Sequence, residues 1–187
     1  TVSNLNLFAE DSTKSIFWLQ AGTGITFSKF SDSDKGLNFL FAVNYENLNS
    51  SVNLSFMHTN ELELFNHPQE YFKSYALKYG RSHDFSMRGL LFPIPLLLLI
   101  NKEFEYSIIG RIGISYNKGL KRTNLLTNDL LENNYDSEIT KGFGIPFEVE
   151  IREEITNYMG MSVLFFSNFN TVKNYWGFSF SIQAGVF

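Results

Sequence analysis

Tyr175-Trp-Gly-Phe-Ser-Phe-Ser-Ile-Gln-Ala-Gly-Val-Phe187 is the stretch of this chain in which the pattern of side chains is clearest. Large apolar residues alternate there with glycine, serine and glutamine at every second position. A period of two predicts a β-strand, because successive side chains of a strand point to opposite faces. One face of this strand is almost wholly apolar, and the other carries small or polar groups.

The same alternation recurs along most of the chain, which predicts an all-β fold. Eight runs carry it, and no convincing amphipathic helix is longer than a few turns. The runs are residues 16–30, 37–45, 52–56, 75–79, 104–116, 143–151, 159–165 and 176–186.

Composition excludes several other classes of protein. The chain has 187 residues, of which 44% are hydrophobic and 18% charged, so a disordered tail is excluded. The formal net charge is -4 and no basic stripe stands out, which argues against nucleic-acid binding. Cysteine is absent, so disulfides, thiolate metal sites and cysteine nucleophiles are excluded. The longest apolar run, residues 90–100, is too short for a membrane-spanning helix, which needs about 20 residues.

The distribution of apolar groups favours a transmembrane barrel over a soluble one. A membrane barrel has an apolar outer face and a polar or small-residue interior, whereas a soluble lipocalin-like carrier has the reverse. Here the small face is rich in Gly, Ser and Ala, and aromatic residues near strand ends suit interfacial girdles. Those aromatics are Trp18, Tyr45, Tyr75, Tyr79, Tyr116 and Trp176. The soluble carrier, with an apolar lumen, remains an alternative.

The fold expected is a closed, antiparallel, eight-stranded transmembrane β-barrel over residues 16–187. It is preceded by an N-terminal periplasmic segment, residues 1–15. Because the chain begins with Thr1, we expect a mature chain whose export signal has been removed. An even number of strands places both termini in the periplasm, with short turns at residues 47–50 and 156–157 on that side. Candidate outer loops, and thus a recognition surface, are residues 31–36, 61–72, 117–137 and 168–174.

Residues 82–102 disturb this scheme, because they fall at an inner turn and yet contain the long apolar run. We predict an interfacial segment anchored by Arg81, Arg88 and Lys102. An additional strand is the alternative, although two prolines would each remove a ladder hydrogen bond. Residues 87–100 are the candidate contact with a partner or with the inner leaflet. The contact residues proposed are Met87, Leu90, Leu91, Phe92, Pro93, Ile94 and Pro95.

Charged residues on the inward face of the predicted strands are the candidate lumen network. They are Lys78, Glu105, Arg111, Glu148, Glu150 and Arg152. Buried charges in a narrow barrel pair with one another and fill the lumen, and this interpretation is favoured. A proton path or a ligand site is the functional alternative. An open pore is not expected, because side chains fill the interior of an eight-stranded barrel.

Several stretches resemble the small outer-membrane β-barrel proteins of Bacteroidota, a largely uncharacterised family. They are Asn60-Glu-Leu-Glu-Leu-Phe65, Ala76-Leu-Lys-Tyr-Gly-Arg81, Gly110-Arg-Ile-Gly-Ile-Ser-Tyr116, Gly144-Ile-Pro-Phe-Glu-Val-Glu150 and the strand from Met161 to Phe169. The resemblance covers most of residues 16–187 and implies an outer-membrane location and eight strands. It implies no catalytic residue, and residues 82–102 depart from its compact form.

The hypothesis that the protein is an enzyme has weak support in the sequence, so no catalytic residue, metal or cofactor is expected. Ser82-His83-Asp84 has the residue types of a hydrolase triad, but neighbours on a strand point to opposite faces. His67 has no second histidine at ligand spacing. Lipid A deacylases are eight-stranded barrels with a His-x-Ser-Asn element, and here Phe165 occupies the histidine position before Ser167-Asn168.

The function expected from the sequence is therefore that of a non-catalytic envelope barrel. It would act as an accessory or structural subunit, or bind a partner through its outer loops. Its expected partners are outer-membrane lipid, including lipopolysaccharide, and a larger envelope complex, with no nucleic acid. A divergent lipid A-modifying barrel is the enzymatic alternative.

Overall fold

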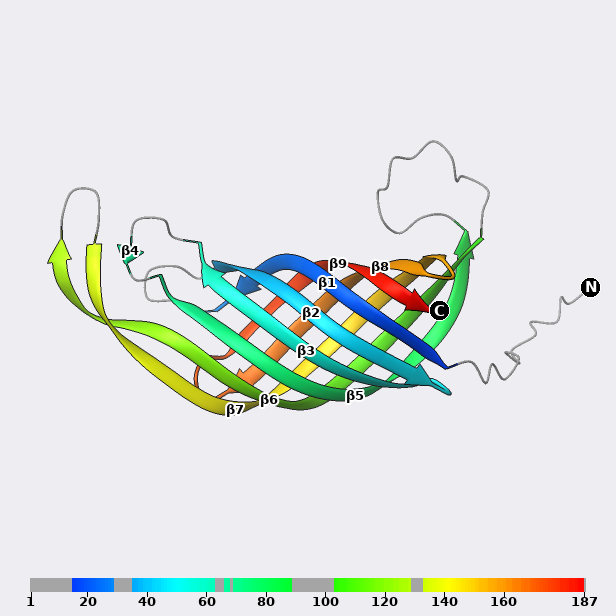
Figure 1. Ribbon diagram of the computed structural model, residues 1–187, viewed down its shortest axis with the longest axis horizontal. Helices are drawn as coiled ribbons and strands as arrows, with labels where there is room; N and C mark the ends of the chain where they lie inside the picture. The colour runs from blue at the N-terminus through cyan, green and yellow to red at the C-terminus, as the bar shows by residue number, and fades with distance from the viewer. Residues whose placement is uncertain are drawn as a thin grey trace, which may run out of the picture.

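The computed structural model describes residues 15–28, 35–62, 66–67, 69–88, 103–128 and 133–186. These residues form β1 (Ile16–Phe27), β2 (Lys35–Asn47), β3 (Ser50–Glu61), β4 (Asn66–His67), β5 (Tyr71–Arg88), β6 (Glu103–Asn128), β7 (Asn133–Thr156), β8 (Met159–Asn170) and β9 (Tyr175–Val186). All except β4 form one ring of antiparallel strands, which closes where β1 pairs with β9 (Figure 1). β4 is a two-residue parallel bridge to β7. The described residues include no helix long and apolar enough to cross a membrane.

Two short turns define one end of the barrel, which we call the turn end. β2 and β3 are joined through Leu48 and Asn49, both with positive φ (48° and 63°). Two central residues with positive φ form the type of two-residue turn whose twist matches that of the two strands it joins. Residues 157–158 form the second short turn, which joins β7 and β8. Both turns lie where the sequence predicted them.

The outer wall of the barrel is mostly apolar, and most of the side chains in its interior are polar. The outward positions from Leu37 to Tyr45 of β2 and from Ile108 to Tyr116 of β6 are apolar or glycine, and Phe41 and Ile114 are 50% and 68% exposed. Inward positions such as Asn44 and Gln183 are fully buried. An apolar shell around a polar interior is the arrangement of a transmembrane barrel, so that prediction is confirmed. A soluble carrier with an apolar lumen is the wrong interpretation, because charged and amide groups line the interior.

One of the six expected girdle residues lies elsewhere. Five of these aromatics are exposed on the outer wall, but Trp18 is fully buried. The reason is the phase of β1: Trp18 shares the inward face with Gln20, whereas Phe17 and Leu19 face outward. Trp18 therefore packs in the lumen and does not belong to the girdle.

The polar stretch at residues 117–137, predicted as a loop, is mostly strand. β6 and β7 continue to Asn128 and from Asn133, and their pairing persists through irregularities after Arg122. We call this end of the barrel the hairpin end, and the β6–β7 hairpin extends beyond its neighbours there (Figure 1). Outside an apolar environment a strand has no need of alternating polarity, so periodicity could not detect it.

The other predicted loops are shorter than expected. Lys35 and Gly36 belong to β2, Tyr71 and Phe72 to β5, and the last turn is confined to residues 171–174. Residues 62–70 contain the β4 bridge.

The first part of the 82–102 segment is strand, since residues 82–88 continue β5 and pair with β6. These seven residues therefore extend β5 instead of forming a separate segment. Residues 89–102, with Leu90, Leu91, Phe92, Pro93, Ile94 and Pro95, lie outside the described residues, as do the side chain of Met87 and residues 1–14. Their proposed contact with a partner stays a prediction.

Candidate functional site

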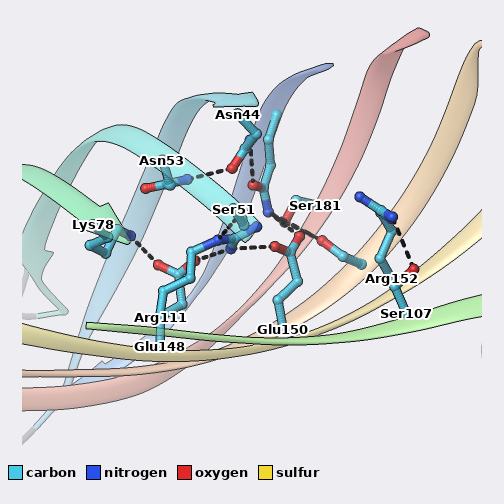
Figure 2. Close-up of polar contacts among 12 residues, drawn as sticks. Asn44, Ser51, Asn53, Lys78, Ser107, Arg111, Glu148, Glu150, Arg152 and Ser181 are labelled. Atoms are coloured by element: carbon cyan, nitrogen blue, oxygen red, sulfur yellow. Dashed lines mark hydrogen bonds and ion pairs between the residues drawn. The ribbon is translucent and has the colours of Figure 1, made fainter. Parts of the chain in front are cut away.

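A buried ion cluster centred on Arg111 spans the lumen (Figure 2). Arg111 Nη1 lies 2.5 Å from Glu148 Oε1 and 2.6 Å from Glu150 Oε2. Its Nε donates to Ser51 Oγ at 3.0 Å. Lys78 Nζ forms a second ion pair with Glu148. The cluster contains two cations and two carboxylates and is therefore neutral overall.

Strand register brings these groups together. Arg111 of β6 lies directly opposite Glu148 of β7, and opposite charges at such positions attract. Glu150 follows on the same inward face, two residues along β7. Two glycines leave room for the long side chains: Gly80 lies opposite Arg111, and Gly113 lies opposite Lys78. The sequence placed Lys78, Arg111, Glu148 and Glu150 on the inward face, and the structure brings all four into contact.

Amide and hydroxyl groups from other strands complete the cluster. Glu150 Oε1 accepts hydrogen bonds from Gln20 Nε2 at 3.0 Å and Gln183 Nε2 at 2.5 Å. Asn44 donates to Gln20 Oε1 at 3.3 Å, and Asn53 donates to Asn44 Oδ1 at 2.6 Å. The network therefore joins strands on both sides of the lumen. Alternation predicts that these amides face inward, but no signal in the sequence indicates that they would meet Glu150.

Arg152 anchors a second cluster nearer the turn end. It forms ion pairs with Glu46 and Glu154, each at 3.3 Å, and donates to Ser107 Oγ at 2.9 Å. Its guanidinium lies 4.6 Å from the ring centre of Trp18, a cation–π contact. Glu105 was predicted to join the lumen network, but its side chain lies outside the described ones.

Apolar side chains fill the lumen toward the hairpin end. A buried cluster there consists of Leu40, Met57, Phe72, Leu164, Phe166 and Tyr175. The cavity between this cluster and the Lys78–Glu148 pair has a volume of about 20 Å³, room for about one water molecule.

Further ion pairs lie on the hairpin-end side of this apolar cluster. Arg122 Nη2 lies 2.7 Å from Glu61 Oε1, and Lys173 Nζ lies 3.1 Å from Glu70 Oε2. Burial lowers the pKa of Lys173, although the carboxylate of Glu70 favours its charged form. A cavity of about 160 Å³ lies beside Glu70 and Lys173. Sequence reasoning missed this group, because its members lie in connections or at strand ends where periodicity is lost.

The arrangement is suited to filling the lumen. Each charge in the two clusters has an opposite charge beside it, and such pairing is what makes buried charges tolerable. Removal of either partner would leave an uncompensated charge away from water. The geometry therefore favours the structural interpretation of the network over a proton path.

The candidate enzymatic residues do not form a relay. Ser82 is buried and donates to Glu46, whereas His83 is exposed. Phe165 faces outward, while Asn168 points into the lumen and donates to Ser115 Oγ at 2.9 Å. Among the described residues, no three histidine or acidic side chains gather as a metal site.

Comparison with known proteins identifies the fold. No protein-family model matches the sequence, and no curated protein matches it. The chain is similar to the crystal structure of Neisserial surface protein A (NspA), with a TM-score of 0.54, 11% identity, and coverage of 90% of this chain and 96% of that one. It is also similar to Ail of Yersinia pestis, in complex with the heparin analogue sucrose octasulfate (TM-score 0.56, 13% identity, 93% and 99% coverage).

A third similar structure is the N-terminal β-barrel domain of Pseudomonas aeruginosa OprF (TM-score 0.50, 8% identity, 90% and 96% coverage). At these identities the likeness concerns the fold alone. Its extent over nearly the whole of each chain confirms the predicted architecture. The chain folds as a closed, antiparallel, eight-stranded β-barrel of the outer-membrane type.

Proposed function

We propose that this chain is a non-catalytic barrel of the bacterial outer membrane that binds a partner through its hairpin end. In this proposal the turn end and both termini face the periplasm, and the hairpin end faces the cell exterior. The filled lumen supports a role that lies outside the barrel interior, since side chains occupy the space that a pore would need.

The β6–β7 hairpin is the observation that carries the proposal. β6 and β7 have 26 and 24 residues, whereas β1, β8 and β9 have 12 each. Near the tip, Leu125 and Leu126 are 50% and 67% exposed. The hairpin is held by its own ladder and by Arg122, which lies 5.0 Å from the ring centre of Tyr135. An ordered projection that exposes two leucines near its tip loses little conformational entropy on binding a partner.

Two kinds of partner fit the proposal: a surface molecule recognised from outside, and a larger envelope complex of which the barrel is an accessory subunit. Apolar exposure at the tip favours a protein surface in either case. Ail was crystallised with a sulfated sugar, but residues 123–128 and 133–138 of this hairpin include Asp136 and Glu138 and no lysine or arginine, so a polyanionic partner has less support at the tip.

Single cysteines test both orientation and binding, because the chain has no cysteine of its own. Leu126→Cys at the hairpin tip is expected to react with a membrane-impermeant maleimide on intact cells. The matched variant Leu48→Cys, exposed to a similar degree in the β2–β3 turn, is expected to react only after the membrane is permeabilised.

A photo-crosslinker attached at position 126 is then expected to give a defined adduct that position 48 does not give. If only the Leu48→Cys variant reacted on intact cells, the orientation would be the opposite of the one proposed. Identical adducts at the two positions, or none at position 126, would contradict binding through the hairpin.

A further inference from the structure

A row of basic side chains crosses four strands on the outer wall. His58 of β3 pairs with Lys73 of β5, Lys73 pairs with Lys118 of β6, and Lys118 pairs with Lys141 of β7. Lys73 lies between buried Phe72 and Ser74, so its side chain points away from the lumen. Lys118 likewise lies between two buried residues, and Lys141 is exposed. We call Lys73, Lys118 and Lys141 the lysine row.

The lysine row concentrates like charge, and the described residues offer it no paired carboxylate. Side chains directly opposite on neighbouring strands have Cβ atoms about 5 Å apart, and like charges at such positions are destabilising. Within the described part of the chain, none of the three lysines forms an ion pair. Lys73 contacts the ring of Tyr71, with its Nζ 5.5 Å from the ring centre.

The outward positions on both sides of the row also lack acidic residues. Toward the turn end they are Phe56, Tyr75, Tyr116 and Phe143, and toward the hairpin end they are Asn60, Tyr71, Leu120 and Ile139. Three neighbouring lysines with no acidic residue at these adjacent outward positions are suited to bind an anion.

The row lies at the edge of the lipid-facing surface. The four aromatic residues on its turn-end side occupy paired positions on four neighbouring strands, with ring centres 5.1 Å apart for Phe56 and Tyr75 and 5.7 Å apart for Tyr116 and Phe143. Aromatic residues of this kind mark the boundary between the apolar band and the headgroups.

The dimensions of β5 agree with that position. Arg81, the next basic residue on its outward face, lies eight residues from Lys73, or about 26 Å along the strand. With the usual tilt of about 40° this separation is about 20 Å along the barrel axis, close to the ~25 Å height of an apolar band. Lysine side chains at such a boundary extend toward the headgroups.

We propose that the lysine row binds the phosphate groups of lipid A, with the acyl chains lying over Tyr75 and Tyr116. The ligand must carry both an anion and hydrocarbon, because the row is continuous with the apolar wall. The choice of lipid A rests on the proposed orientation, in which the hairpin end lies in the outer leaflet. His58 flanks the row, stacked on Tyr71 with ring centres 5.8 Å apart.

Native mass spectrometry of the full chain in neutral detergent tests this site, with diphosphoryl lipid A as the probe. The variant Lys73→Gln/Lys118→Gln/Lys141→Gln is expected to bind it about 100-fold more weakly. The control Lys35→Gln/Arg81→Gln/Lys121→Gln changes the net charge equally at positions outside the row, and is expected to bind within about threefold of the wild type. A dephosphorylated lipid A should bind weakly to all three proteins.

Thermal unfolding distinguishes loss of the site from loss of the fold. Without lipid, the lysine-row variant is expected to be at least as stable as the wild type, because repulsion has been removed. Equal lipid A binding by the variant and the wild type, or an equal loss in the control, would overturn the proposal. Equally tight binding of phosphatidylglycerol would overturn the assignment to lipid A. Binding in detergent does not depend on orientation, so this experiment can fail or succeed independently of the cysteine labelling.

Discussion

Arg111→Met is expected to lower the free energy of unfolding by about 3–5 kcal/mol, because it leaves a buried carboxylate without its cation. Glu148 would retain Lys78, but Glu150 would keep only the amides of Gln20 and Gln183. Urea unfolding of the barrel in lipid vesicles, followed by tryptophan fluorescence, would measure the loss. A variant that cannot fold would appear as a barrel that no longer resists heating in gel electrophoresis.

Two controls separate this effect from a general loss of charge. Arg81→Met removes an exposed cation and should change the stability by no more than about 0.5 kcal/mol. Arg111→Met/Glu150→Met removes both charges of one pair, and it should recover most of the loss, since apolar residues replace buried ion pairs at little cost. If Arg111→Met were as stable as the wild type, the ion cluster would not hold the lumen together.

Gly113→Ala is the second substitution with a large expected effect. A Cβ at this position would lie 2.0 Å from the carbonyl oxygen of Leu77 and 2.7 Å from Cα of Lys78. Because the contact is with backbone, the strands must separate, at a cost near or above the upper end of the usual range of about 1–3 kcal/mol for overpacking.

Gly110→Ala is the matched control in the same strand. No atom lies within 4 Å of a Cβ at this outward position. The same change of residue should therefore leave stability within about 0.5 kcal/mol. Urea unfolding of the two variants side by side would check the difference, and equal stabilities would show that β5 and β6 are not packed this closely at Gly113.

The sequence predicted the barrel well because alternation between lipid and lumen is strict within the membrane band. Chain neighbours such as Phe178 and Ser179, or Leu77 and Lys78, lie on opposite faces of their strand, and their polarity alone shows which of them faces the lumen. The alternation therefore identified four members of the central cluster as residues that face the lumen. Their actual contacts depend on register between distant strands, which no local pattern encodes, and so the pairing of Glu150 with Gln20 and Gln183 could not be predicted.

Prediction failed where the lipid no longer constrains the chain. Most of residues 117–128 pair with β7 although they include Lys118, Lys121 and Arg122, and their polarity suggested a loop. Trp18 was assigned to the girdle from its residue type, whereas its phase in β1 places it in the lumen beside Arg152. The lysine row is likewise invisible in sequence, because its three members lie on three strands.

Thiol reactivity along neighbouring strands would test the inside-out arrangement most directly. Single cysteines would replace Leu54 and Leu77, which face outward, and Ser55 and Ala76, which face the lumen. In reconstituted vesicles, a lipid-soluble maleimide should react with the first pair and not with the second, and a membrane-impermeant maleimide should react with neither pair. Reaction of the impermeant reagent at positions 54 and 77, or of the lipid-soluble reagent at positions 55 and 76, would contradict a filled barrel with a lipid-facing apolar wall.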